Sequence, residues 1–150
     1  FNERCFVRLL GDMRSYNFVV DITPEVEGNQ YRIRAIDFDQ QSYEGNRKLY
    51  LPHYFKENNK LISLGIQHMN IATMRQYQQE ERSLIANRAK LGRDRLEDLF
   101  DIMKIDNIAP PEKTEQLSIE LADHHGIREF LGLNTMGQIV EKHLYSCLKQ

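Results

Sequence analysis

The sequence predicts an α+β fold that is mainly helical, with one β-hairpin near the N-terminus packed on four or five helices. Two observations lead to this prediction. β-Branched and aromatic residues gather in two short runs, residues 17–22 and 31–38, as is typical of strands. From Leu61 onward, apolar residues recur at helical spacing as far as the C-terminus. A length of 150 residues suits a single domain.

The first part of the chain is predicted to hold a short helix and the hairpin. Apolar residues within positions 1–10 suit the end of an amphipathic helix, although a strand also fits so short a run. Residues 23–30 include proline, glycine and asparagine and are predicted to form the turn between the strands. The second strand should run antiparallel to the first. Because two strands alone are marginally stable in water, the hairpin is expected to lie on the helices.

The remainder, residues 46–150, is predicted to be helical after an irregular stretch at 46–59. Helices are expected at residues 71–91, 94–105 and 112–125, and after Thr135. Local signals mark their ends: Gly92 interrupts the first, Pro110 follows the second, Gly126 stops the third and Thr135 caps the last. The chain is thus one domain, in which residues 1–45 hold the hairpin. Because it starts with Phe1 rather than methionine, we expect it to be the C-terminal piece of a longer chain.

Composition excludes several classes of protein. With 41% hydrophobic and 28% charged residues, the chain is an ordinary globular protein. A net charge of −2 predicts no nucleic-acid partner, and no apolar run is long enough for a membrane span. The two cysteines, Cys5 and Cys147, have no metal-ligand spacing and predict buried free thiols in a reducing compartment. A cytoplasmic location is therefore expected.

Three oxygen-bearing side chains suggest a chemistry. Asp12 is followed five residues later by Asn17, and Asp37 lies twenty residues further on in an Ile-Asp-Phe-Asp run. An antiparallel hairpin returns its end to its beginning, so Asp37 should come back beside Asn17. Two carboxylates and a carboxamide suit a Mg²⁺-dependent phosphoryl transferase. Arg14, two residues past Asp12, could face the phosphate.

The motifs resemble the protein-kinase-like fold. Residues 11–17 (Gly-Asp-Met-Arg-Ser-Tyr-Asn), a hairpin and then residues 36–39 (Ile-Asp-Phe-Asp) look most like the branch of the aminoglycoside phosphotransferases and choline kinases. The resemblance implies a kinase C-lobe that uses Mg²⁺ and ATP to phosphorylate a hydroxyl of a small molecule or lipid head group. It implies that Asp12 is the catalytic base, that Asn17 and Asp37 are metal ligands, and that Arg14 replaces the family's basic residue.

The chain also departs from that family. Leu10 stands where a histidine is usual, and Asp39 where many kinases have glycine. The glycine-rich loop, the strand lysine and the helix glutamate of an N-lobe are all missing. The resemblance therefore implies that an N-lobe is supplied in cis or by a partner. The alternative is a non-catalytic helical interaction module, either a degenerate kinase-like lobe or an unrelated domain, in which Asp12 merely caps a turn.

The adjacent pair His124 and His125 also suggests a metal site. Neighbouring residues on a helix point about 100° apart, and no cysteine or third histidine lies near them in the sequence. The pair is therefore predicted to be a polar helix end, and no metal ligand is assigned to it.

Overall fold

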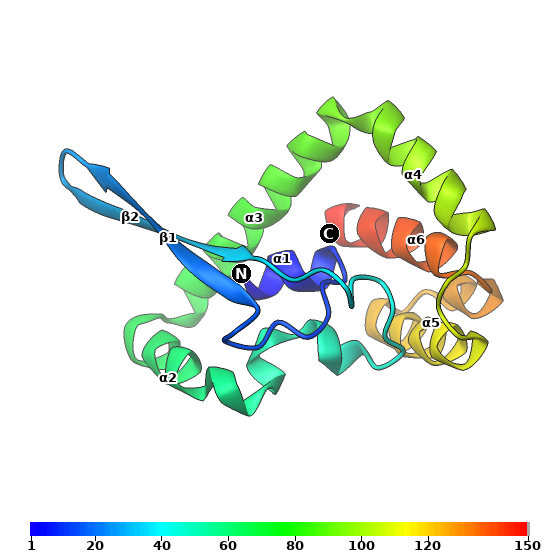
Figure 1. Ribbon diagram of the computed structural model, residues 1–150, viewed down its shortest axis with the longest axis horizontal. Coiled ribbons are helices and arrows are strands. Elements are labelled where there is room, and N and C mark those ends of the chain that lie inside the picture. The colour runs from blue at the N-terminus through cyan, green and yellow to red at the C-terminus, as the bar shows by residue number, and fades with distance from the viewer. Residues whose placement is uncertain (150) are drawn as a thin grey trace.

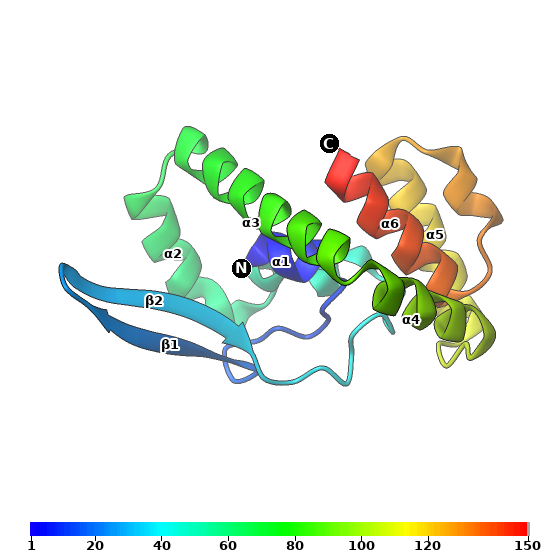
Figure 2. The ribbon, with the colours of Figure 1, turned by 90° about the horizontal axis from the view of Figure 1, so that it is seen from above.

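A computed structural model describes residues 1–149 (Figures 1 and 2). One short helix precedes a β-hairpin, and five further α-helices follow it. The α-helices and strands are α1 (Asn2–Val7), β1 (Phe18–Glu25), β2 (Gly28–Ala35), α2 (Asn59–His68), α3 (Ile71–Leu91), α4 (Arg93–Ile105), α5 (Pro111–His125) and α6 (Met136–Lys149). The predicted fold class, α+β and mainly helical with an N-terminal hairpin, is confirmed.

β1 is longer than the predicted strand 17–22, and β2 begins and ends three residues before the predicted strand 31–38. β1 and β2 pair antiparallel from Phe18↔Ala35 at the base to Glu25↔Gly28 at the tip. The predicted turn at residues 23–30 was therefore wrong, because only two residues connect the strands. Proline at position 24 is tolerated since both strands of a two-stranded sheet are edge strands. Gly28 has a φ of 140°, a conformation that residues with a side chain rarely adopt.

The helices hold the hairpin at its base. The Phe18 ring packs against the Phe1 ring with centroids 5.0 Å apart, and Arg4 donates to the carbonyl oxygen of Ile33 at 2.8 Å. Most strand side chains beyond the base are exposed, and the tip extends past the helices (Figure 2). The contact expected between hairpin and helices is thus confined to one end of the ribbon.

Local capping sets the ends of the long helices, close to where the sequence predicts them. Asn70 accepts the backbone N–H of Thr73 at 2.9 Å at the start of α3, and Gly92 follows its last residue. α5 ends at Gly126, which adopts the left-handed conformation with φ 65°. At the start of α6, Thr135 and Gln138 exchange side-chain to backbone hydrogen bonds, forming a capping box.

The stretch 46–59, predicted to be irregular, forms three short 3₁₀ helices named η1 (Arg47–Tyr50), η2 (Pro52–Tyr54) and η3 (Lys56–Asn58), and its last residue begins α2. Tyr50 anchors this segment: it is buried, and its hydroxyl donates to the carbonyl oxygen of Glu44 at 2.6 Å. The segment therefore passes from the hairpin to α2 while remaining fastened to the core.

The hydrophobic core lies around α1, which contacts both α3 and α6 (Figure 1). Its largest fully buried apolar side chains are Leu9, Tyr50, Phe100, Leu117, Leu121, Phe130 and Ile139. Both cysteines are buried and free, as predicted. Within residues 1–149, every helix is too short or too polar to cross a membrane.

Candidate functional site

The segment that carries Asp12 is held in an unusual backbone conformation. Leu9 and Asp12 have φ of 48° and 55°, in the left-handed region that most side chains avoid. Backbone bonds from later residues hold the segment there: the N–H of Ser42 donates to Leu9 at 2.9 Å, and the N–H of Asp12 donates to Leu49 at 3.2 Å. Such backbone strain gathers at functional sites more often than elsewhere.

Gly11 is required at its position in this segment. A Cβ atom there would lie 2.6 Å from the carbonyl oxygen of Gln40, closer than real Cβ contacts allow. Leu10 and Gln41 form an isolated antiparallel bridge beside it. The chain before Asp12 and the chain after Asp39 are thus pressed together, which a side chain at position 11 would prevent.

Asn17 is turned toward Asp12. Its side-chain nitrogen donates to the backbone oxygen of Asp12 at 2.7 Å and to the carboxylate Oδ2 at 3.3 Å. Asn17 is also buried, which fixes the orientation of its amide. Because the nitrogen faces Asp12, the side-chain oxygen lies on the opposite side of the amide group. The structure therefore brings Asp12 and Asn17 into direct contact.

Asp37 returns to the same end of the hairpin. The N–H of Ile36 donates to the backbone oxygen of Asn17 at 3.0 Å, so the residue that precedes Asp37 pairs with Asn17. Asp37 Oδ1 accepts the backbone N–H of Asp39 at 3.2 Å. Within residues 1–149, no hydrogen bond joins Asp37 itself to Asp12 or Asn17. Asp37 is thus next to the Asp12–Asn17 pair but not bonded to it.

Asp39, which sequence reasoning did not assign to the site, belongs to the same acidic group. Its pKa is raised, first by a hydrogen bond with the Asp37 carboxyl and further by the negative charges of Asp37 and Asp12. These interactions place three carboxylates close enough to affect one another. The Asp-x-Asp spacing of the Ile-Asp-Phe-Asp run is the sequence signal for this fourth residue.

Arg14 is held between two carboxylates. Its Nε donates to Asp12 Oδ1 at 2.6 Å, its Nη1 donates to Glu57 at 2.9 Å, and its guanidinium lies 4.6 Å from the centre of the Phe55 ring. The hydrogen bond to Asp12 raises the pKa of Arg14. In this arrangement Arg14 orients the Asp12 carboxylate and fastens it to the segment before α2.

Asn58 also holds the segment that carries Asp12 in place. It is buried, and its side-chain nitrogen donates to the carbonyl oxygen of Met13 at 2.9 Å and to that of Pro52 at 2.7 Å. The residue that follows Asp12 is therefore tied to η2 and η3. No sequence motif marks Asn58, because its role depends on contacts between segments 45 residues apart.

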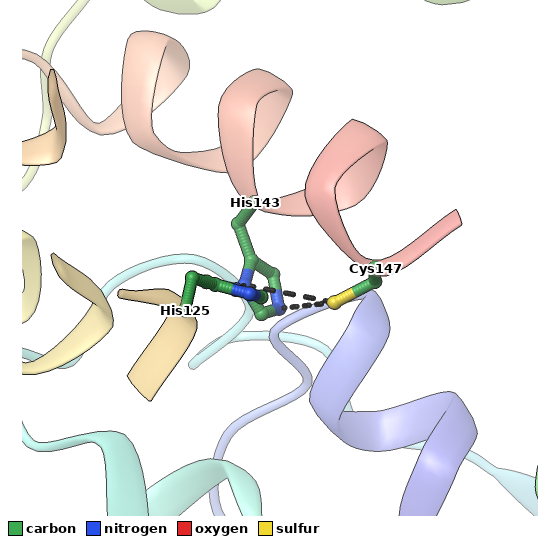
Figure 3. A group of neighbouring side chains, drawn as sticks. All are labelled: His125, His143 and Cys147. Atoms are coloured by element: carbon green, nitrogen blue, oxygen red, sulfur yellow. Dashed lines mark hydrogen bonds between the residues drawn. The ribbon is translucent and has the colours of Figure 1, made fainter. Parts of the chain in front are cut away.

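A second group of side chains lies elsewhere, between α5 and α6. One ligand-type atom from each of His125, His143 and Cys147 lies within 4.8 Å of the others (Figure 3). No cysteine or third histidine lies near His125 in the sequence, but the fold brings His143 and Cys147 to it. The two helices pack together, which brings α6 to the end of α5. The signal in the sequence was the spacing of four between His143 and Cys147, which puts both on one helix face.

Hydrogen bonds set the proton positions in this group. His143 Nε2 lies 2.8 Å from the carbonyl oxygen of Phe6, which can only accept, so Nε2 carries the proton. His143 Nδ1 is then the acceptor for the N–H at His125 Nε2, 3.0 Å away. Burial lowers the pKa of His143 to about 3 and that of His125 to about 4, so both rings are neutral at pH 7.

Cys147 is a protonated thiol at neutral pH. Its Sγ lies 3.8 Å from His143 Nδ1 and 3.6 Å from Nε2. Burial raises the pKa of the thiol to about 12. A nucleophilic cysteine needs a thiolate that a substrate can reach, and this one is 1% exposed. The group therefore lacks the properties of a cysteine–histidine catalytic pair.

The described part of the chain thus contains two groups of side chains that could bind a metal ion or take part in a reaction. One is an oxygen-rich group around Asp12, Asn17 and Asp37, and the other is a buried group of nitrogen and sulfur atoms. Comparisons of the chain with models of known protein families, with curated proteins and with solved structures give no match.

Proposed function

We propose that this chain is the C-lobe of a kinase-like phosphotransferase, which moves a phosphoryl group from Mg²⁺–ATP to a hydroxyl of a small molecule or lipid head group. The observation that carries the proposal is the placement of Asn17. Its nitrogen is bonded to Asp12, and its backbone pairs with Ile36, the residue before Asp37. This supports a common site for the base and the proposed metal ligands.

The donor atoms fit the proposed ion. Asn17, Asp37 and Asp39 offer carboxamide and carboxylate oxygens, the ligands that Mg²⁺ prefers. Asp37 is oriented by the backbone N–H of Asp39, and Asn17 by its two bonds to Asp12. When bound, Mg²⁺ offsets negative charge on the phosphates. Softer metal ions favour nitrogen and sulfur ligands, so they should bind to this set of oxygen donors less tightly.

Asp12 is the group proposed to act on the acceptor. Its carboxylate orients the acceptor hydroxyl and takes its proton as the oxygen attacks the γ-phosphorus, while ADP leaves. Arg14 keeps that carboxylate in one orientation through the 2.6 Å bond to Oδ1. The groups that cover the nucleotide, a glycine-rich hairpin and a strand lysine, are proposed to come from an N-lobe in cis or in trans.

Metal binding tests the first part of this proposal. Mn²⁺ replaces Mg²⁺ at oxygen sites and reports its binding through its electron paramagnetic resonance signal. Asp37→Asn should weaken Mn²⁺ binding at least about tenfold, or about 1.4 kcal/mol. Asp21→Asn is the matched control, since Asp21 is an acidic residue of β1 that pairs with Arg34 away from the site. Equal affinities of the wild type and Asp37→Asn for Mn²⁺ would remove the proposed metal site.

Turnover tests the second part. Phosphoryl transfer from ATP to choline, ethanolamine or an aminoglycoside is measured by mass spectrometry with the N-lobe present. Asp12→Asn keeps the size of the side chain, and asparagine tolerates a positive φ. We therefore expect this variant to keep its fold, checked by circular dichroism, and to lose transfer. Wild-type turnover by Asp12→Asn would contradict the role of Asp12 as the base.

A non-catalytic interaction module is the second candidate, and one observation favours it. Large apolar side chains are exposed along α2 and the first half of α3: Leu61, Leu64, Ile66, Ile71, Met74 and Tyr77. Exposed apolar surface of this kind often marks contact with another protein. Calorimetry with ATP and Mg²⁺, with the N-lobe present, separates the candidates. A dissociation constant below about 100 μM, or roughly −5.5 kcal/mol, requires a formed nucleotide site and argues against this alternative.

A further inference from the structure

The side chains of His125, His143 and Cys147 converge from two helices on one point in the interior (Figure 3). We propose that these three residues bind a single Zn²⁺ ion, with a water molecule as the fourth ligand. This site is separate from the oxygen-rich group around Asp12 and does not depend on the phosphotransferase proposal. Its donors are two imidazole nitrogens and one thiolate sulfur, a set that suits zinc and excludes Mg²⁺.

The spacing of the donor atoms is close to that of a zinc centre. In a tetrahedral site with Zn–N bonds of about 2.0–2.1 Å and a Zn–S bond of about 2.3 Å, two nitrogens lie ~3.3 Å apart and nitrogen and sulfur ~3.6 Å apart. Here the His125 and His143 nitrogens are 3.0 Å apart. Cys147 Sγ lies 3.8 Å from His143 Nδ1 and 3.6 Å from Nε2, so the sulfur must turn toward Nδ1 to share an ion with it. The third side of the triangle is at most 4.8 Å and must shorten by about 1 Å to match.

Neighbouring groups orient the ligands as they do around known metal ions. Metal-binding histidines usually donate the N–H of the other ring nitrogen to a carbonyl or carboxylate. His143 does so, because its Nε2–H is bonded to the Phe6 carbonyl and its Nδ1 lone pair faces His125 Nε2. The His125 ring is stacked on the Phe130 ring, 5.4 Å away and nearly parallel at 9°. Both imidazoles are therefore held in place before any ion arrives.

The proton balance of binding is simple. The ion takes the position of the proton that His125 Nε2 now shares with His143 Nδ1. His125 changes to the tautomer with its proton on Nδ1, which leaves its charge unchanged. Cys147 loses its thiol proton to solvent and becomes the thiolate ligand. One Zn²⁺ ion enters and one proton leaves.

The charges around the group are compatible with a thiolate. Arg82 donates to the backbone oxygen of Cys147 at 3.3 Å, so a positive charge lies beside the residue that would supply the thiolate. Glu3 forms an ion pair with Arg82, so the cation is offset and does not repel the metal strongly. Arg47 faces the histidines from η1, and Asp123 faces His124 from α5. These groups balance in number, two basic and two acidic.

Zinc competition with a chromophoric chelator tests the proposal on the full chain. The wild type should bind one equivalent of Zn²⁺. Cys147→Ser and His125→Asn should each weaken binding at least about tenfold, since loss of even an outer partner of a metal ligand costs 10–100-fold. Two variants serve as matched controls and should bind as the wild type does. Cys5→Ser removes the other buried cysteine, and His124→Asn removes the neighbouring histidine.

Cobalt supplies an independent readout. Co²⁺ in a tetrahedral site with a thiolate ligand gives a sulfur-to-metal absorption band, which should appear in the wild type and in Cys5→Ser but not in Cys147→Ser. Bound Zn²⁺ should also raise the melting temperature of the wild type and not that of His125→Asn. His143 is left unchanged in these tests because its bond to Phe6 also supports the fold.

Several results would overturn the proposal. One is the absence of binding at Zn²⁺ concentrations up to about 10 μM, which corresponds to a free energy weaker than roughly −7 kcal/mol. Another is equal binding by the wild type, Cys147→Ser and His125→Asn, which would indicate adventitious surface sites. If one of the two ligand variants fails to fold, the other decides the question, because they lie on different helices.

Discussion

Arg4 of α1 and Glu81 of α3 form a two-pronged ion pair, with Nε–Oε1 and Nη2–Oε2 distances of 2.7 and 3.0 Å. The remaining nitrogen of the same guanidinium, Nη1, donates to the carbonyl oxygen of Ile33 in β2. One side chain thus joins α1, α3 and the base of the hairpin. The hydrogen bond and charge of Arg4 lower the pKa of Glu81, as expected of a formed ion pair.

Replacing Arg4 should therefore destabilise the protein. Arg4→Met keeps the aliphatic stem but leaves the Glu81 carboxylate, whose side chain is 14% exposed, without its partner. We expect a loss of about 2–3 kcal/mol in the free energy of unfolding, measured by urea denaturation. Arg34→Met is the control, because Arg34 pairs with Asp21 on the exposed face of the hairpin and should cost less than about 1 kcal/mol. Equal losses in both variants would contradict this account.

Gly137 sets how closely α4 and α6 approach. A Cβ atom at this position would lie 2.5 Å from the carbonyl carbon of Met103 and 2.6 Å from the backbone nitrogen of Lys104. Alanine normally stabilises a helix relative to glycine by up to about 1 kcal/mol. Here Gly137→Ala should instead destabilise the protein by about 1–3 kcal/mol, because the two backbones must separate. The melting temperature is the measurement.

Gly132→Ala is the matched control for that substitution. A Cβ atom at position 132 meets no atom within 4 Å, so alanine should change the stability by less than about 0.5 kcal/mol. A melting temperature for Gly137→Ala equal to that of Gly132→Ala would show that α4 and α6 are not in close backbone contact.

Stability should fall as the pH is lowered, because His143 is held neutral. Its pKa is about 3 in the folded protein and about 6.5 in an unfolded chain. Between these values the unfolded state binds the additional proton. The free energy of unfolding therefore decreases as the pH falls from about 6.5 toward 3, by up to about 1.4 kcal/mol per pH unit. Above pH 6.5 this contribution is complete and constant.

Urea denaturation between about pH 6.5 and pH 3, with EDTA present, measures how the free energy of unfolding changes with pH. His125 contributes in the same direction, since burial lowers its pKa to about 4. His143→Gln retains an N–H that can reach the Phe6 carbonyl but has no titrating group. When the free energy of unfolding is plotted against pH, the slope for this variant should be smaller than that of the wild type by the contribution of one proton, up to about 1.4 kcal/mol per pH unit. Identical slopes would mean that His143 titrates normally in the folded protein.

Asn58 should matter for the loop that carries Asp12. Asn58→Ala leaves the carbonyl oxygens of Met13 and Pro52 without their donor, and we expect a loss of about 1–3 kcal/mol in the free energy of unfolding. The neighbouring Asn59 is exposed, so Asn59→Ala should have little effect. Hydrogen exchange should also quicken at the Asp12 amide in Asn58→Ala. An unchanged exchange rate at the Asp12 amide would mean that Asn58 does not stabilise this loop.

Much of the helical structure follows from local sequence. The helix Ile71–Leu91 has the bounds that the spacing of its apolar residues and Gly92 predict, and Gly126 ends α5 as expected. Thr135 caps α6 through Gln138, three residues away. These signals act within one or two helical turns, so they can be recognised in the sequence without knowledge of the fold. The hairpin turn was placed less well, because proline and glycine occur inside edge strands as well as in turns.

Some contacts of the candidate site around Asp12 could be predicted from the sequence, and others could not. The spacing of Asp12 and Asn17 and the antiparallel hairpin predict that Asp37 returns near them, and pairing of Ile36 with Asn17 places it there. The bonds of Arg14 to Glu57 and of Asn58 to Met13 were not predictable, since each joins segments more than 40 residues apart. Neither residue belongs to a local motif.

The sequence by itself determined, to within a residue, where α3, α4 and α5 begin and end and where α6 begins, because capping and apolar spacing depend on near neighbours along the chain. Only the tertiary structure decided that His125 meets His143 and Cys147 and that the hairpin is held at one end. Those outcomes depend on which helices pack together, and α6 reaches α5 and α1 through buried contacts between residues distant in sequence. Burial at that meeting point also shifts the pKa values of all three side chains, which no isolated segment could do.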